Sequence, residues 1–502
     1  MESINEWLLT WGDHLWTWAV LPVVVVLGVY FTVRSGVVQL RLLPDMFRTL
    51  TDKTPRTADG EPQSVSAFQA FTISAASRVG VGNIAGVGTA IAIGGPGAVF
   101  WMWLMAFIGG ASSFIESSLA QLYKVREKDA FRGGPAFYME RGLGARWMGV
   151  LFAIILIVCF PFAFSSLQAN TITATVAGGM SADVATWLPW VIGPILAILT
   201  ALVVFGGVRR IASVTQYLVP FMALAYLLLG LAVVALHVDR LPEVFGQIFA
   251  QAWGPNEVVG AAFGYIVLTG VKRGMFSNEA GLGSAPNAGA SAAVTHPVKQ
   301  GLVQTLGVYF DTFLVCSITA FIILVSVPDL ANAERGIGLT QGALTSTLGP
   351  WANIALAVIV FLLAFSSILG NYYYGESNIE FITRGTAVLT GYRVLVIVAV
   401  LVGSVVTADL VWNFADGVMG LMALINLIAI ALLSPIAIRL LKDYTAQRRA
   451  GRDPVFTRDR MPDVTGIECW EDELTVTGPL DISLERGQAG VDPIHRPSRG
   501  GE

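Results

Sequence analysis

The stretch SAFQAFTISAASRVGVGNIAGVGTAIAIGG, residues 66–95, decides the fold of this 502-residue chain. It is long and apolar enough to cross a bilayer, which takes about 20 such residues. Its middle nevertheless holds Arg78, Asn83 and four glycines. Each glycine costs roughly 1 kcal/mol relative to alanine inside a helix, and an arginine costs roughly 3 kcal/mol at a helix centre on insertion scales. We therefore predict a broken helix that lines a polar cavity, as in transporters.

Tight helix packing is the alternative interpretation of the same glycines. Gly82 and Gly86 form a small-xxx-small pair, which lets two membrane helices approach closely. Packing explains this pair, but it does not explain Arg78, Asn83 or the two remaining glycines of the run.

The composition predicts a polytopic membrane protein. Hydrophobic residues make up 54% of the chain and charged residues only 13%, with a mean hydropathy of +0.66. The net charge of −4 gives no indication of nucleic-acid binding. The three cysteines form no CxxC motif and the four histidines are scattered, so neither a disulfide framework nor a metal centre is expected.

Apolar segments predict about eleven membrane spans. They lie near residues 16–33, 66–95, 98–123, 148–170, 185–205, 215–237, 258–288, 301–327, 351–374, 394–411 and 417–440. Basic residues concentrate in alternate loops, which places those loops in the cytoplasm and the N-terminus outside. We predict a transporter domain over residues 1–442, with an extra helix at about 16–33 and a core at about 66–440. Residues 443–502 form a polar cytoplasmic tail that we expect to be mostly disordered, although 467–476 could order on a surface.

Two further polar stretches interrupt the apolar segments. Residues 271–288 read VKRGMFSNEAGLGSAPNA, five spans after the first broken segment, which is the relation expected of inverted repeats. The simpler alternative is a cytoplasmic loop. Residues 366–376 read SSILGNYYYGE, in the eighth span of the same series. Its serines could merely bond to the carbonyls of their own helix.

Together these stretches resemble the alanine or glycine:cation symporter family. The similarity covers roughly residues 16–443 and is carried by the 66–95 stretch, by KRGMFSNEAGLGSAPNA and by FAFSSILGNYYYGESNIEF. The resemblance implies an all-α, LeuT-type fold of five plus five inverted helices with one extra N-terminal helix. It also implies a symporter, not an enzyme, that imports alanine or glycine with Na⁺ through the inner membrane of a bacterial or archaeal cell. The expected partners are the amino acid, the sodium ion and the bilayer, with no enzymatic cofactor.

The resemblance also implies where the amino acid would bind. Backbone amides freed at Gly80, Val81 and Gly82 would hold its carboxylate, with Asn83 adding a side-chain contact. An unwound backbone from Gly270 through Gly274 to Ser277 would offer carbonyls to the ammonium group. Gln168 would face the substrate from the third helix of the series, unless it only bonds a neighbouring helix.

For sodium, alignment on the LeuT-type fold implies five neutral oxygens. These are the carbonyls of Ala76, Val79 and Leu363 and the hydroxyls of Ser366 and Ser367.

Two residues depart from the pattern of the family. Arg78 replaces a small residue of some members, argues against a further sodium site there, and is expected to pair with Glu116, Glu279, Asp311 or Glu376. Asn371 replaces a tryptophan of alanine-type members. A glutamine-preferring or proton-coupled carrier therefore remains an alternative, and a membrane-embedded sensor is a distant one.

Overall fold

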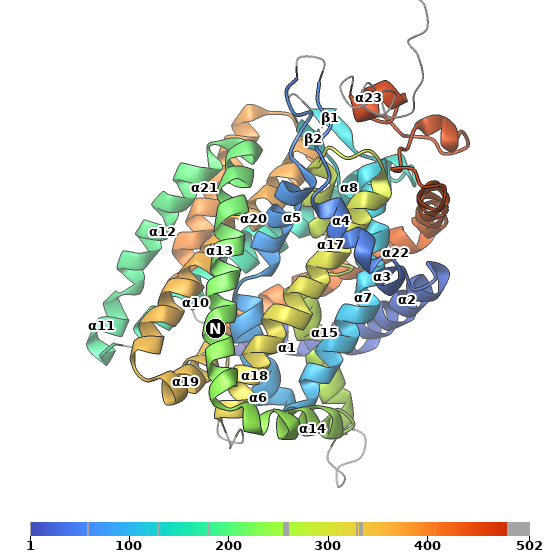
Figure 1. The fold of residues 1–502 in the computed structure, drawn as a ribbon. Helices are drawn as coiled ribbons and strands as arrows, with labels where there is room; N and C mark the ends of the chain where they lie inside the picture. Colours follow the sequence, from blue (N-terminus) through green and yellow to red (C-terminus); the bar gives the residue numbers. More distant parts are fainter. Residues whose placement is uncertain are drawn as a thin grey trace, which may run out of the picture.

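The computed structural model describes residues 2–57, 60–127, 130–178, 180–254, 261–327, 330, 335–406 and 408–478. Helices run between two ends of a bundle (Figure 1). One end, at the top of the figure, carries a short β-hairpin; we call it the hairpin end. The opposite end carries the short helices α11, Ala182–Trp187, α14, Leu241–Gln251, and α19, Ile337–Leu348; we call it the vestibule end. The all-α prediction is confirmed, apart from that two-stranded hairpin, β1 (Val125–Glu127) and β2 (Ala130–Arg132).

Long helices account for most of the predicted spans. Eight in the described part of the chain are long and apolar enough to cross a membrane, and a bent pair makes nine. The eight comprise α1 (Glu2–Leu15) with η1 (Trp16–Val20) and α2 (Leu21–Arg34), α7 (Gly97–Leu122), α9 (Arg146–Ile157) with η3 (Val158–Phe164) and α10 (Ser165–Ala177), α13 (Gly207–Leu236), α17 (Pro297–Tyr309) with η5 (Phe310–Cys316) and α18 (Ser317–Ser326), α20 (Trp351–Ile382), α21 (Thr386–Gly403) and α22 (Ala408–Arg449). The π-helical segments η1, η3 and η5 lie within three of these spans.

Shorter helices complete the bundle and its two ends. The apolar helix α12 spans Pro189–Val204. The others are α3 (Val38–Arg41), α4 (Leu43–Leu50), α8 (Pro135–Arg141), η4 (Val238–Arg240), η6 (Arg458–Arg460) and α23 (Glu473–Thr477). The segments that lead into α11 and α19 fall partly outside the described residues.

The first broken helix forms where the glycine run predicts it. α5, Ala67–Arg78, begins at a capping box in which the Ser66 hydroxyl accepts from the Gln69 N–H and the Gln69 side chain accepts from the Ser66 N–H. It ends as Val79 leaves helical geometry, with a ψ of 87°. The chain then continues as η2 (Gly82–Gly86) and α6 (Val87–Gly94), bent by 51° from α5. The prediction of a broken segment is confirmed.

The second broken helix breaks later than predicted. α15 is continuous from Ala261 to Asn278, and the chain resumes as α16 at Ala285–Ser291. Between them Glu279, Gly281 and Gly283 have φ angles of 57°, 80° and 80°, a left-handed geometry that glycine adopts without strain. The cytoplasmic-loop alternative is wrong, because the described part of this stretch is a buried pair of helices.

The two broken helices cross in opposite directions. α5 packs against α16, whereas α6 packs against α15. At the hairpin end, Val65 before α5 and Ala292 after α16 form a parallel β-bridge, and the Ala293 N–H donates to the Val65 carbonyl at 2.9 Å. This arrangement is the one predicted for inverted repeats.

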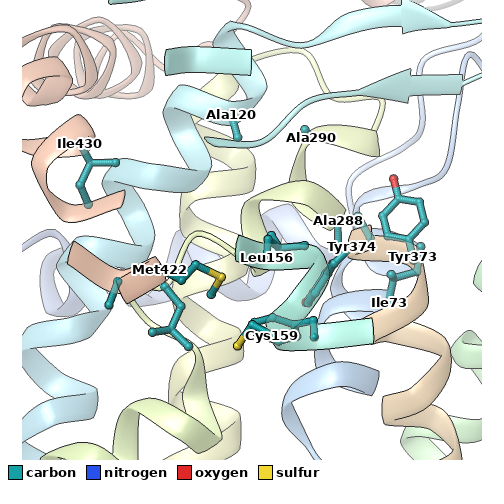
Figure 2. Packing of buried hydrophobic residues seen from close by; sticks show 14 of the residues in the cluster. Ile73, Ala120, Leu156, Cys159, Ala288, Ala290, Tyr373, Tyr374, Met422 and Ile430 are labelled. Carbon is teal, nitrogen blue, oxygen red and sulfur yellow. The ribbon is translucent and has the colours of Figure 1, made fainter. Parts of the chain in front are cut away.

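One buried cluster holds the elements of the bundle together. Ten of its side chains, from seven helical elements, are labelled in Figure 2: Ile73 of α5, Ala120 of α7, Leu156 of α9, Cys159 of η3, Ala288 and Ala290 of α16, Tyr373 and Tyr374 of α20, and Met422 and Ile430 of α22. These elements are far apart in the sequence. The packing therefore fixes both broken helices against the surrounding long helices.

The tail is more ordered than expected. α22 continues to Arg449, beyond the predicted boundary at 442, and residues 450–478 pack on the hairpin end with Phe456, Met461 and Trp470 buried. The Trp470 Nε1–H donates to the Gln121 carbonyl at 3.1 Å. Lys124 lies over the Trp470 ring, and its burial lowers its pKa to about 7. The expectation of disorder is therefore wrong for 450–478, and residues 479–502 lie outside the described chain.

Candidate functional site

The first break frees backbone N–H groups that side-chain oxygens accept. The Gly80 N–H donates to the Asn83 Oδ1 at 2.8 Å, and the Val81 N–H donates to the Gln168 Oε1 at 3.2 Å. Gln168 comes from α10, and all four residues are buried. The structure thus brings Gly80, Val81, Asn83 and Gln168 together. Each freed amide carries a neutral, displaceable partner.

Side chains would not fit at the two glycines closest to these amides. A Cβ at Gly80 would overlap the Ser367 hydroxyl, and one at Gly82 would lie 2.9 Å from the Phe276 ring and 3.3 Å from the Ser277 Cα. By contrast, a Cβ at Gly86 would meet only Trp412, at 3.9 Å. The packing alternative therefore does not hold for Gly86. The glycines at 80 and 82 let the backbone approach α20 and α15 closely.

A buried carboxylate joins the two broken helices. The Asp311 Oδ1 accepts from the Asn83 Nδ2 at 2.6 Å, and its Oδ2 accepts from the Ser277 hydroxyl at 2.9 Å. Thr312 donates to the same oxygen at 3.1 Å. Ser277, a predicted site residue, is thus connected to Asn83 through Asp311. From the sequence, Asp311 was predicted only as a candidate partner of Arg78 and not as a residue of the site.

Three of the five predicted cation ligands lie together beside the first break. The Ser367 hydroxyl is 2.9 Å from the Ala76 carbonyl oxygen and 3.0 Å from that of Leu363. Ser366 also donates to Leu363, but its hydroxyl lies 3.3 Å from the sulfur of Met222 on α13. The Val79 side chain is fully buried. Neutral oxygens are a donor set that suits a hard monovalent cation.

Asn371 lies among polar side chains of three elements. Its Oδ1 is 2.8 Å from the Ser77 hydroxyl of α5, and its Nδ2 donates to the Ser165 hydroxyl of α10 at 3.5 Å. The Ser77 hydroxyl is also 2.6 Å from the Glu279 Oε1. Asn371 therefore contacts neighbouring helices, and it does so next to both breaks.

The predicted contribution of Gly270 and Gly274 is wrong. Both lie inside the continuous helix α15, so their carbonyls are not freed by unwinding. A Cβ at Gly270 would lie 2.5 Å from Trp101 of α7, and one at Gly274 would lie 3.3 Å from the Met102 Cα of the same helix. These glycines permit close packing of α15 against α7.

The expected acid partner of Arg78 is also absent from the described residues. Its Nη1 donates to the Gln304 carbonyl at 3.1 Å, and its Nε and Nη2 have no hydrogen-bond partner in that part of the chain. The four candidate acids bond elsewhere: Glu116 to the second break, Glu279 to Ser77 and Ser284, Asp311 to Asn83 and Ser277, and Glu376 to Arg393. Arg78 is nevertheless only 2% exposed.

Comparison with known proteins identifies this arrangement. The sequence pattern of the sodium:alanine symporter family matches residues 1–458. The chain belongs to this family. Its members are symporters, so this protein is an amino-acid:cation symporter and not an enzyme.

Relatives align over nearly their whole length. The symporter is 50% identical over 474 residues to the amino-acid carrier protein AlsT of Bacillus subtilis (strain 168), covering 94% of this chain and 99% of that one. It is 45% identical over 459 residues to the probable sodium/glutamine symporter GlnT of the same organism, with 91% and 94% covered. It is 35% identical over 459 residues to the sodium/alanine symporter AgcS of Methanococcus maripaludis, with 89% and 97% covered.

A solved structure agrees with the predicted fold class. The crystal structure of MhsT in complex with L-phenylalanine matches with a TM-score of 0.52 at 15% identity, covering 78% of the symporter and 99% of MhsT. The symporter therefore has the LeuT-type fold.

The second break of the symporter is satisfied by an acid. Glu116 of α7 accepts from the N–H groups of Gly281 and Gly283, at 3.2 Å and 3.1 Å, and from the Asn426 Nδ2 at 2.7 Å. Glu116 is fully buried. Glu116 thus accepts three hydrogen bonds from groups of the protein itself, two of them from the backbone of the second break.

Aromatic side chains separate the site from a vestibule. A cavity of about 850 Å³ at the vestibule end is lined in part by Thr89, Gln341 and Trp412. The Trp412 ring packs on Phe276 with centroids 4.8 Å apart, and a Cβ at Gly82 would lie 2.9 Å from the Phe276 ring. Sequence reasoning missed both rings. Phe276 stands next to Ser277 in the quoted KRGMFSNEAG motif, so its position in the motif was the available signal.

Proposed function

We propose that the symporter imports a small neutral amino acid, alanine or glycine, coupled to Na⁺, by alternating access. The observation that carries this proposal is the pair of backbone amides at Gly80 and Val81, which donate to the side-chain oxygens of Asn83 and Gln168. A substrate carboxylate is a better acceptor for an N–H group than a neutral amide oxygen. It can therefore displace the oxygens of Asn83 and Gln168, and the half-helix that starts at η2 adds the partial positive charge of its N-terminus.

The cation would bind next to the substrate. We assign the sodium site to the carbonyl oxygens of Ala76, Val79 and Leu363 with the hydroxyls of Ser366 and Ser367. Its support is the cluster of Ser367 with the Ala76 and Leu363 carbonyl oxygens. Because Ala76 lies in α5 and Leu363 in α20, an ion held there links the broken helix to its long neighbour. Binding of the ion thereby favours the conformation in which α5 and α20 lie close together.

We assign the hairpin end to the cytoplasm and the vestibule end to the outside. Basic residues of the loop after α2, among them Arg34, Arg41 and Arg48, support this orientation under the positive-inside rule. The tail then lies in the cytoplasm and the N-terminus outside, in the inner membrane of a bacterial or archaeal cell. With this orientation the vestibule faces outward, while the Val65–Ala292 bridge closes the cytoplasmic side.

Uptake into proteoliposomes tests the proposal. The purified chain is reconstituted, and labelled alanine, glycine, serine and glutamine are offered under an inward sodium gradient, a proton gradient or no gradient. We expect sodium-driven accumulation of alanine or glycine. Accumulation driven by protons alone would favour the proton-coupled alternative. Binding without gradient-driven uptake would favour a sensor.

Glutamine is the second candidate substrate, and Asn371 favours it. The residue offers a donor and an acceptor where a tryptophan would fill the space. The chain is also similar to the probable sodium/glutamine symporter GlnT. A site built around such hydrogen bonds can reject apolar analogues strongly. The test is competition by glycine, alanine, serine, asparagine and glutamine in the wild type and in Asn371→Trp. Glutamine selectivity requires that glutamine compete in the wild type and lose potency in the variant.

A further inference from the structure

The N-terminal helix α1 packs along the start of α22 at the vestibule. Gly12 of α1 approaches the Gly417 backbone, since a Cβ there would lie 3.9 Å from the Gly417 Cα. The Asn413 Nδ2 donates to the Asn5 Oδ1 at 2.8 Å, and the Trp16 Nε1–H donates to the Asp416 carbonyl at 2.8 Å. α1 and this part of α22 therefore form one packed body, and α15 touches that body over a smaller contact.

Four charged side chains connect that body to α15. Lys272 of α15 lies 3.0 Å from the Asp13 Oδ1 of α1 and 3.1 Å from the Asp416 Oδ2 of α22. Arg273 also pairs with the same oxygen of Asp416. The side chains of Lys272, Arg273 and Asp416 are 9%, 9% and 3% exposed, whereas that of Asp13 is 34% exposed. Two cations of α15 thus face two acids of the other body.

Asp13 supplies the second negative charge of this cluster. Without it, two buried cations would share the single carboxylate of Asp416. A buried charge that loses its partner is strongly destabilised. Two other charged residues that line the vestibule, Arg335 and Asp409, are exposed and so are screened by water. Asp13 therefore decides whether the positive charges of Lys272 and Arg273 are matched by an equal number of negative charges.

The cluster is placed where it can control the entrance to the site. The Arg273 guanidinium lies over the Trp412 ring, 4.7 Å from its centroid, and Trp412 packs on Phe276 at the first break. The Arg273 Nη1 and the Asp416 Oδ1 have no hydrogen-bond partner in the described chain, so the two side chains are joined through the Asp416 Oδ2. A change in the distance between α15 and α22 would alter the ion pairs and the aromatic contact together.

We propose that the extra N-terminal helix is a working part of the outer gate, with Asp13 as a positioning residue that balances Lys272 and so holds α15 against α22. This inference rests on the proposed transport function and on the outward assignment of the vestibule. Asp13 itself does not contact the substrate. It acts through Lys272 and Asp416 on the contact between Trp412 and Phe276.

A double-mutant cycle tests the charge balance. Asp13→Asn leaves two cations for one acid, and we expect it to lower the rate of alanine uptake roughly tenfold. Adding Lys272→Gln leaves the single pair of Arg273 and Asp416, and we expect the double variant to recover most of that loss. Asp13→Glu, which keeps the charge, should stay close to the wild type. Glu6→Gln removes an exposed acid from the same helix and is the matched control, expected to show no coupling to Lys272.

Thermal unfolding of the purified variants gives a second, substrate-free readout. The Asp13 and Lys272 substitutions should be coupled there too, with the double variant unfolding at a higher temperature than Asp13→Asn. Additive effects in the unfolding cycle, or an Asp13→Asn variant with wild-type uptake, would overturn the proposal. If the unfolding temperatures show coupling between Asp13 and Lys272 but the wild type transports no amino acid, the proposed function is overturned and the proposed charge balance is retained.

Discussion

The two broken helices of the symporter expose backbone N–H groups in the same way but satisfy them differently. At the first break the acceptors are the neutral side chains of Asn83 and Gln168. At the second break the acceptor is the buried carboxylate of Glu116, which bonds two backbone amides and Asn426. Neutral acceptors can be displaced by a substrate carboxylate, whereas a buried acid with three donors cannot be displaced cheaply. We therefore propose that the first break binds the substrate, whereas the second is a permanent structural feature.

The largest expected effect is the loss of the folded protein when Glu116 is replaced by alanine. The N–H groups of Gly281 and Gly283 and the Asn426 side chain would remain buried without their acceptor, at about 1 to 3 kcal/mol for each group. We expect Glu116→Ala to give little monodisperse protein in size-exclusion chromatography. Glu116→Gln, which keeps one oxygen, should be intermediate in yield and in melting temperature. A Glu116→Ala variant with the melting temperature of the wild type would contradict the structural role that we give to the second break.

Replacing the counterpart at the first break should affect binding more than folding. Gln168→Ala removes one acceptor, that of Val81, and water can take its place. We expect a melting temperature close to that of the wild type. Alanine binding should be roughly tenfold weaker, because the Gln168 side-chain amide, once displaced from Val81, would donate to the substrate carboxylate, and the variant lacks that hydrogen bond to a charged group. Calorimetric titration with alanine in the presence of sodium measures the change. Equal affinity in the variant would show that Gln168 only connects two helices.

The first break was predictable from the sequence, because its cause is local. Glycines and a charged residue inside an apolar segment are unfavourable wherever that segment lies, and the capping box at Ser66 marks the start of α5. The second break was misplaced for a related reason. Gly270 and Gly274 carry the same local signal, but they serve packing against α7, and the turn itself uses the positive φ angles of Gly281 and Gly283.

Partners distant in sequence were not predictable. Glu116 meets residue 281 and Asp13 meets residue 272 only because the helices fold together, and one sequence contains no spacing that encodes such contacts. The same limitation applies to Arg78. The cost of burying it was evident, whereas its bond to the Gln304 carbonyl depends on the packing of α5 against α17.

The smallest expected effect separates the two serines of the proposed cation site. The Ser367 hydroxyl contacts carbonyl oxygens of both α5 and α20, whereas the Ser366 hydroxyl contacts one of them and the sulfur of Met222. We expect Ser367→Ala to raise the half-saturating sodium concentration several-fold, because the free energy lost is about that of one hydrogen bond. Ser366→Ala should raise this concentration less. Uptake against sodium concentration measures both. An unchanged half-saturating sodium concentration in the variant that combines Ser366→Ala and Ser367→Ala would contradict the assignment of the sodium site.

Two alanine substitutions one helical turn apart distinguish substrate binding by the first break from a purely structural role of its glycines. A Cβ at residue 82 would lie 2.9 Å from Phe276, whereas one at residue 86 would have only Trp412 within 4 Å, at 3.9 Å. Sodium-dependent binding of labelled alanine is measured on purified Gly82→Ala and Gly86→Ala. We predict that both variants fold, that Gly86→Ala binds like the wild type and that Gly82→Ala does not bind. Normal binding by Gly82→Ala would show that the first break does not bind the amino acid.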